Sequence, residues 1–393
     1  MTRSKECRAR VLHIITRMIL GGAQENTLLS VEGLHRMPSY EVDLATGPAL
    51  GQEGTLMDRA KDAGGDLFLL ENLVRPIAPI RDARSLLELR KLCRGYDIVH
   101  THSSKAGILG RLAASKERVP VVVHTIHGLP FHPYQNRLIY HLYVRLERWA
   151  SRKSHGMIAV GRVMKETAED AGIRCAGGIR VIYSGMELDH FHPVDKETME
   201  ARRRQEGFPL DAPLIFKVGR LFDLKGHEFA VRALARLGNK KPAPHLVFVG
   251  DGPKREMLFE QARSLGVADR LHCTGLVPPQ TVGYWLSMAD VVVHASLREG
   301  LPRVIPQALA SGKPVVAFDV DGAREVLFQG ETGYLVKAKD VEGLAQGVSK
   351  LLDSPSQASK MGRKGREWVV QRFSAETMVQ GISALYQELL RKK

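Results

Sequence analysis

Short apolar runs, separated by stretches with helical spacing, constrain this chain more than any other feature. A first series of runs covers residues 11–16, 41–46, 66–70, 97–102, 119–126, 156–160 and 180–183. A second series covers residues 214–219, 245–250, 270–275, 291–296, 314–318 and 333–336. Continuously apolar strands that alternate with helices form parallel sheets covered on both faces. The sequence therefore predicts an α/β fold of two tandem, doubly wound, Rossmann-like domains.

The break between the two series sets the expected domains. We expect an N-terminal domain over residues 1–190 and a C-terminal domain over 191–374. A terminal helix within 375–393 should pack back toward the N-terminal domain. Gly and Pro residues and a charged stretch place the hinge at about 185–212. Ligands bind beyond the carboxyl ends of parallel strands, so the expected site is a cleft between two facing sheets.

Charge and composition limit the partners. The net charge is +14, and residues 1–185 hold 27 Lys and Arg against 18 Asp and Glu. This excess suits an anionic membrane surface or nucleic acid, and an ordinary solvated surface explains it equally well. In the helical stretch 136–153, Arg145, Arg148 and Arg152 share one face, for which we prefer a solvated role over lipid contact.

The expected location is the cytoplasm, with peripheral contact at the inner face of the plasma membrane left open. No apolar run approaches a membrane span or the core of a signal peptide. The four cysteines lack the spacing of a zinc site or a disulfide framework.

The segment 296–316, SLREGLPRVIPQALASGKPVV, carries the strongest functional signal. A strand runs into the Glu299-Gly300 turn, and a helix begins after Pro302. Unpaired amides at a helix N-terminus attract an anion. A carboxylate beside that anion can hold hydroxyl groups, so the segment predicts a site for a nucleotide sugar.

Two further glycine-containing loops indicate phosphate binding. Arg220 and Lys225 follow a strand that ends at Gly219, where they can neutralise a diphosphate without a metal. Two solvent-facing cations are the alternative. Gly21 and Gly22, between the first strand and the first helix, can bring backbone amides close to a phosphate.

Polar residues also follow two strands of the first series. His127 ends the run 119–126 and is expected in the cleft, with a buried structural histidine equally consistent. Ser103, Ser104 and Lys105 start a helix, where Lys105 can meet an anionic acceptor and helix capping alone explains the serines. His124 and His127 lack the acidic partner of a zinc motif, so we expect no metal.

In this order, the motifs resemble family-4 glycosyltransferases, which are retaining enzymes of the GT-B fold. The resemblance covers nearly the whole chain. It is carried by GGAQ near the start, HG at 127–128, GRLFDLKGH at 219–227, VGDGP at 249–253, TGLV at 274–277 and EGLPRVIPQALASGKPVV at 299–316.

The resemblance implies a role for each position. Arg220, Lys225 and the amide of Gly22 would bind the donor diphosphate, and Glu299 would hold hydroxyls of the transferred sugar. His127 would lie beside the reacting sugar. The remaining donor contacts would be Gly300, Leu301 and Pro302 at the phosphate and sugar, and Leu276 and Val277 at the nucleobase.

One position departs from the family. The second Glu of the E-x7-E motif, which binds the ribose, is Gln307 here. A neutral acceptor loses about 1 kcal/mol relative to a carboxylate, which weakens donor binding without abolishing it. Activity is still expected because Glu299 is retained.

The resemblance thus implies a retaining, metal-independent hexosyltransferase that uses a UDP- or GDP-sugar and has no cofactor. The acceptor would be a glycan or a lipid-linked sugar in cell-surface polysaccharide or glycolipid synthesis. Three alternatives stay open: a GT-B sugar-nucleotide epimerase or phosphorylase, a catalytically silent nucleotide-sugar-binding partner, and a nucleic-acid binder. The last is the least favoured because no recognition module is present.

Overall fold

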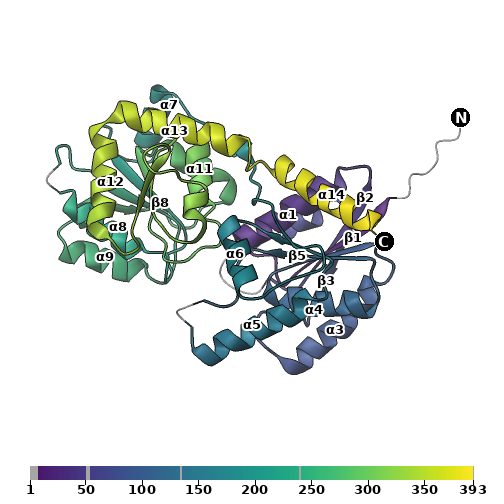
Figure 1. Ribbon diagram of the computed structural model, residues 1–393. Coiled ribbons are helices and arrows are strands. Elements are labelled where there is room, and N and C mark those ends of the chain that lie inside the picture. Colours follow the sequence, from purple (N-terminus) through teal and green to yellow (C-terminus); the bar gives the residue numbers. More distant parts are fainter. Residues whose placement is uncertain (1–7, 50–53, 133–134, 239, 393) are drawn as a thin grey trace, which may run out of the picture. The chain divides into compact units, whose positions relative to one another are not determined.

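The chain divides into two compact units. The computed structural model describes residues 8–49, 54–132, 135–238 and 240–392. The first unit comprises Met1–Met186 and Ala375–Lys393, and the second comprises Glu187–Ser374. The last helix of the chain therefore belongs to the same unit as the first strand (Figure 1).

The first unit is built on a parallel sheet with the strand order β3-β2-β1-β4-β5-β6-β7. Its strands are β1 (Ala9–Ile15), β2 (Tyr40–Thr46), β3 (Leu67–Leu69), β4 (Ile98–His102), β5 (Val121–Ile126), β6 (Gly156–Ala159) and β7 (Ile179–Val181). Its helices are α1 (Gly22–His35), α2 (Met57–Lys61), α3 (Pro79–Cys93), α4 (Ser104–Lys116), α5 (Arg137–Ser151), α6 (Arg162–Asp170) and α14 (Ala375–Arg391).

Alternate residues of the central strand β1 enter different cores of this unit. Val11 and Ile15 pack with side chains of α1 and α14. Leu12 and Ile14 pack with side chains of α3 and α4 on the opposite face. This two-residue period places helices on both faces of the sheet (Figure 1).

The second unit repeats the plan with the strand order β10-β9-β8-β11-β12-β13, again all parallel. Its strands are β8 (Leu214–Val218), β9 (His245–Val249), β10 (Leu271–Cys273), β11 (Val291–His294), β12 (Val315–Phe318) and β13 (Gly333–Val336). Its helices are α7 (Lys196–Gln205), α8 (His227–Arg236), α9 (Arg255–Ser264), α10 (Val282–Ser287), α11 (Val304–Ala310), α12 (Val341–Asp353) and α13 (Pro355–Val370), with short 3₁₀ turns at Leu188–His190, Ala268–Arg270, Pro279–Thr281 and Asp321–Glu325.

The two predicted series of strands are confirmed, with small differences at their ends. The predicted run 119–126 begins as a strand only at Val121. Pro120 has no amide hydrogen to offer a sheet, and the amide of Val119 bonds to Ala114 on α4. Among the helices of the described residues, none has both the length and the apolar character needed to cross a bilayer.

Candidate active site

A half-buried ion pair of the second unit joins the loops that follow two neighbouring strands. Lys225 Nζ donates to Glu299 Oε1 at 2.6 Å. Lys225 lies in the loop after β8 and Glu299 in the loop after β11, and these strands pair in the sheet. The structure thus brings together two residues that lie 74 positions apart and that the sequence assigned to a diphosphate and a sugar.

Close packing between these loops makes the pair possible. Leu297 donates its amide to the carbonyl of Leu224 at 2.8 Å. Gly226 has φ of 68°, and a Cβ there would lie 1.8 Å from the carbonyl oxygen of Ala295. Only glycine fits this approach, which holds the start of α8 against the loop that follows β11.

Glu299 is held from several sides. Ser296 Oγ donates to Glu299 Oε1 at 3.0 Å, and the amide of Glu299 donates to Asp321 Oδ2 at 2.5 Å. Burial raises the pKa of Glu299, but the charge of Lys225 and the hydrogen bonds outweigh this effect and leave the pKa lowered. The carboxylate is therefore ionised and able to accept from hydroxyl groups.

Two buried titratable groups lie behind this pair, and the sequence analysis did not identify them. Burial, followed by the charge of Lys225, lowers the pKa of Lys217 in β8 to about 7. Burial lowers the pKa of His294 in β11 to about 3, although the charge of Glu299 opposes this shift. His294 Nε2 lies 3.8 Å from Glu299 Oε1. For Lys217, the sequence did hold a signal of a buried charge, because this lysine interrupts an otherwise apolar strand.

The other residues that the resemblance predicts to contact the donor lie around the same edge of the second sheet. Arg220 is exposed, with its guanidinium carbon 5.0 Å from the ring centre of Phe222. Gln307 lies on α11, and the remaining residues are Gly300, Leu301 and Pro302 before α11 and Leu276 and Val277 after β10. Pro306 occupies the first turn of α11, where its missing amide hydrogen breaks no intrahelical bond.

In the first unit, the predicted residues end the central strands. Gly21 precedes α1, and Gly22 is its first residue. His127 directly follows β5 and is half-buried, with Nε2 2.9 Å from His102 Nδ1. His102 is the last residue of β4, so the two rings meet at the carboxyl edge of the sheet.

The capping role expected for Ser103 is wrong. Ser103 stands at the N-cap of α4 with φ of 59°, and its side chain makes no capping bond. Its hydroxyl contacts Thr16 Oγ1 at 2.7 Å, and Thr16 Oγ1 accepts the amide of Ala106 in the first turn of α4. The amide at the start of α4 is therefore capped by Thr16, which follows β1 and lies 90 residues away in the sequence. Local sequence could not reveal this contact.

Lys105 already has an anionic partner within the chain. Its Nζ lies 2.5 Å from Asp82 Oδ1 and also donates to the carbonyl of Pro76. Ser104 is the first residue of α4. An acceptor that contacts Lys105 would therefore have to compete with Asp82.

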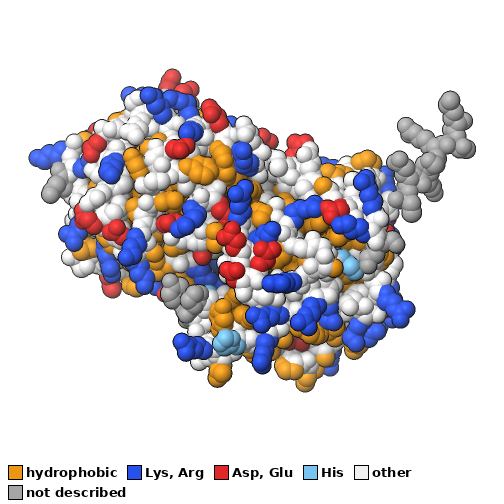
Figure 2. All heavy atoms as spheres, viewed as in Figure 1, with side chains coloured by type: hydrophobic (Ala, Val, Ile, Leu, Met, Phe, Trp, Pro, Cys, Tyr) orange, Lys and Arg blue, Asp and Glu red, His pale blue; other side chains and the backbone are white. Residues whose placement is uncertain are grey.

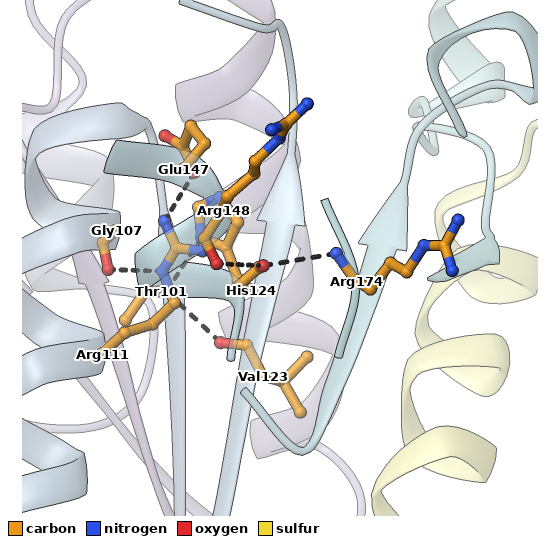
Figure 3. Close-up of polar contacts among 9 residues, drawn as sticks. Thr101, Gly107, Arg111, Val123, His124, Glu147, Arg148 and Arg174 are labelled. Carbon is orange, nitrogen blue, oxygen red and sulfur yellow. Dashed lines mark hydrogen bonds and ion pairs between the residues drawn. The ribbon is translucent and has the colours of Figure 1, made fainter. Parts of the chain in front are cut away.

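His124 belongs to the interior and not to the edge. Its Nδ1 lies 2.9 Å from Thr101 Oγ1. Figure 3 shows Arg111 beside it, directed at Glu147, with Nη2 to Oε2 at 2.8 Å. This buried ion pair joins α4 to α5. Because His124 is buried beside it and contacts Thr101, we assign His124 a structural role.

Matches to protein families cover most of the chain. Residues 20–190 match the family described as Glycosyltransferase Family 4, and residues 198–368 match the one described as Glycosyl transferases group 1. The chain is 31% identical over 315 residues to D-inositol 3-phosphate glycosyltransferase of Acidothermus cellulolyticus, covering 76% of this chain and 68% of that one. The chain belongs to glycosyltransferase family 4.

Further similarities span the full length of this glycosyltransferase. It is 27% identical over 396 residues to UDP-Gal:alpha-D-GlcNAc-diphosphoundecaprenol alpha-1,3-galactosyltransferase of Escherichia coli, with 100% of both chains covered. Its fold matches Anabaena Alr3699/HepE in complex with UDP, with a TM-score of 0.82 at 21% identity over 96% of this chain and 100% of that one. The predicted GT-B fold and glycosyltransferase class are confirmed, and the family favours transfer over the three alternatives.

Proposed function

We propose that this glycosyltransferase moves a hexose from a nucleoside-diphosphate sugar to a lipid-linked or other glycan acceptor, with retention and without a metal. The product would serve cell-surface polysaccharide or glycolipid synthesis. The Lys225–Glu299 pair is the observation that carries the proposal, because it sets a cation for phosphate beside a carboxylate for hydroxyl groups. The E. coli relative, named for a UDP-sugar donor and a diphosphate-lipid acceptor, supports the substrate class.

The donor would bind at the carboxyl edge of the second sheet. Arg220 and Lys225 take the diphosphate, and Glu299 accepts hydrogen bonds from the sugar. Gly300, Leu301 and Pro302 line the phosphate and sugar, Leu276 and Val277 contact the base, and Gln307 accepts from one ribose hydroxyl. In the first unit, the amides at Gly21 and Gly22 are offered to phosphate, and His127 contacts the sugar.

The chemistry needs charge stabilisation more than a dedicated base. Breaking the bond from the anomeric carbon to the phosphate leaves negative charge on the diphosphate, which Arg220 and Lys225 stabilise. The acceptor oxygen bonds to the anomeric carbon on the face from which the diphosphate leaves, and the leaving phosphate oxygen takes the proton of the acceptor hydroxyl. The new bond therefore keeps the anomeric configuration of the donor.

The test is transfer to a diphosphate-lipid-linked sugar from each member of a panel of UDP- and GDP-hexoses, chosen first by thermal shift. A bound donor raises the stability by RT ln(1 + [L]/Kd). We expect one donor to give a product with retained configuration, by NMR of the anomeric proton, at a rate unchanged by EDTA. An inverted product, or a rate abolished by EDTA, would refute the proposed mechanism.

Although the sequence alone favoured a solvated face for the arginines of α5, we also infer that this helix touches an anionic membrane, where a lipid-linked acceptor would be found. Leu138 is 81% exposed and Leu142 is 53% exposed on this helix. Arg137 and Arg145 are exposed beside them. Figure 2 shows hydrophobic and basic side chains together at the lower edge, where α5 lies. Exposed leucines beside arginines suit the headgroup region of anionic lipid better than water.

Co-sedimentation with vesicles tests this contact. We expect binding to phosphatidylglycerol-containing vesicles, weaker binding to purely zwitterionic ones, and loss of binding in the double variant Leu138→Asp/Leu142→Asp. A matched control is Ile80→Asp on α3, because Ile80 is 73% exposed on a different helix. Equal binding by the double variant and the wild type would remove α5 from the proposal.

A further inference from the structure

Six side chains of the first unit form one continuous line of polar contacts, called here the histidine chain. In order, its members are His127, His102, His13, Tyr386, His100 and Thr125. The successive contacts are 2.9 Å from His127 Nε2 to His102 Nδ1, 3.0 Å from His102 Nε2 to His13 Nδ1, 3.4 Å from His13 Nε2 to Tyr386 Oη, 2.5 Å from Tyr386 Oη to His100 Nδ1, and 2.7 Å from His100 Nε2 to Thr125 Oγ1.

The fold explains why these residues meet. His13 on β1 lies opposite His100 on the neighbouring strand β4. His100 and His102 are two residues apart, so their side chains share one face of the sheet. Tyr386 comes from α14, which packs with β1 and β4 in one core on that face. The line therefore runs from the buried centre of the sheet to His127 at its carboxyl edge.

The buried rings are neutral. Burial lowers the pKa of His13 to about 3 and holds the pKa values of His100 and His102 well below their ordinary value. A neutral imidazole has one nitrogen that donates and one that accepts. In each of the three rings both nitrogens have a partner in the chain, so the tautomer of one ring dictates the tautomer of the next.

Only two arrangements of hydrogens satisfy every contact. Either each group donates toward Thr125, or each group donates toward His127. In the first arrangement the Thr125 hydroxyl only accepts, and the described contacts give its own hydrogen no acceptor. A buried donor without an acceptor is costly, and Thr125 is only 3% exposed. In the second arrangement Thr125 donates to His100, every hydrogen from Thr125 to His102 has an acceptor within the line, and the proton of His127 is left on Nδ1.

We propose that the histidine chain is a positioning device that holds His127 in a single tautomer, with its proton on Nδ1. His102 donates to His127 Nε2, so Nδ1–H is the donor that His127 offers to an oxygen of the sugar. This inference rests on the proposed contact of His127 with the sugar. His102, His13, Tyr386, His100 and Thr125 act only through His127.

A metal ion is the competing use of these residues. Ligand atoms of His13, His100 and His102 lie within 4.8 Å of one another. Those nitrogens, however, are directed at one another and at Tyr386 over hydrogen-bond distances. A metal would need the lone pairs that these contacts use, so stoichiometric metal in the purified protein would overturn the proposal.

Nitrogen-15 NMR of the histidine rings reads the tautomer directly and needs no substrate. We expect His127 in the wild type to show a protonated Nδ1 and an unprotonated Nε2. Tyr386→Phe interrupts the chain and Thr125→Val removes the donor that sets its direction. Both variants should show averaged His127 nitrogen shifts. In a transfer assay their kcat should fall at least twofold, the loss expected when half of the molecules hold the other tautomer, with little change in KM.

Tyr40→Phe is the matched control. Tyr40 Oη contacts Ser383 Oγ on the same helix α14 at 2.9 Å, outside the chain. It should lower the melting temperature about as much as Tyr386→Phe and leave the His127 spectrum unchanged. The proposal is overturned if wild-type His127 carries its proton on Nε2, or if Tyr386→Phe and Thr125→Val keep the wild-type spectrum. Wild-type turnover by His127→Ala would instead refute only the proposed sugar contact, because the tautomer is measured separately.

Discussion

The two sheets of this glycosyltransferase handle buried polar groups in opposite ways. In the first unit, His13, His100 and His102 are neutral and find partners within the chain. In the second unit, Lys225 and Glu299 form an ion pair at the edge where we propose that the donor binds. Behind them, the ring nitrogens of His294 have no hydrogen-bond partner among the described residues.

The comparison shows that buried polar groups stabilise the fold in the first unit and, as we propose, prepare a binding site in the second. The hydrogen-bonded histidines fix the geometry at the centre of the first sheet without any ligand. A charged and incompletely bonded edge gives up some stability and is ready to bind an anion. Changes at the buried ion pair of the first unit should therefore act mainly on folding, and changes around Lys225 mainly on catalysis.

The largest effect is expected from the buried ion pair of the first unit. Glu147→Ala leaves the fully buried Arg111 without its carboxylate, so the free energy of unfolding should fall by about 3–5 kcal/mol in urea denaturation. The double variant Arg111→Met/Glu147→Leu should recover most of that loss. Asp58→Ala is the control, since its pair with Lys61 is exposed and should cost less than about 1 kcal/mol. Similar losses for Glu147→Ala and Asp58→Ala would contradict the comparison.

A change at the edge of the second unit should spare folding and damage catalysis. Lys225→Ala is expected to lower the transfer rate by about 10²-fold, or about 3 kcal/mol, with little change in melting temperature. Lys254→Ala is the matched control. Lys254 lies in the loop after β9, the strand next to β8, and forms a surface ion pair with Asp223. Equal transfer rates for Lys225→Ala and Lys254→Ala would contradict the proposal that Lys225 stabilises the leaving diphosphate.

A buried lysine makes the stability of the second unit depend on pH. The pKa of Lys217 is about 7 in the folded chain and about 10.5 in the unfolded chain, so the unfolded chain binds more protons between these values. Stability from this group therefore rises as the pH goes from 7 to 10.5. Lys217→Met should be about 2 kcal/mol more stable than the wild type at pH 7, since each pKa unit corresponds to about 1.4 kcal/mol and repacking recovers only part. The gain should shrink toward pH 10, and a gain independent of pH would exclude this cause.

The smallest effect is expected at the position that departs from the family motif. Gln307→Glu restores a charged acceptor for the ribose and should tighten donor binding by about 1 kcal/mol, or five- to tenfold. Calorimetric titration with the donor found by the thermal-shift panel measures this change. An unchanged Kd would show that Gln307 does not contact the ribose.

Sequence reasoning found what is local. Apolar runs gave the strands of both sheets, and the loops that follow them gave Arg220, Lys225 and Glu299. It did not give the Lys225–Glu299 contact, because the pairing of β8 with β11 depends on the order of strands in the sheet. Sequence reasoning also gave Ser103 the role of capping α4, whereas the capping contact comes from Thr16 after β1.

The sequence could not predict contacts between side chains that lie far apart along the chain. Tyr386 and His13 lie 373 positions apart and meet only because α14 returns to the first unit. The histidines at 100 and 102, two apart in an apolar strand, were a visible signal of one polar face. Their partners required the packed structure.

Calorimetric titration of UDP and of a UDP-hexose into the wild type, Lys225→Ala and Glu299→Gln tests the central claim most directly. If Lys225 binds the diphosphate and Glu299 the sugar, Lys225→Ala weakens the binding of both ligands. Glu299→Gln then weakens the UDP-hexose and leaves UDP unaffected. Wild-type affinity of both variants for the UDP-hexose would contradict the account.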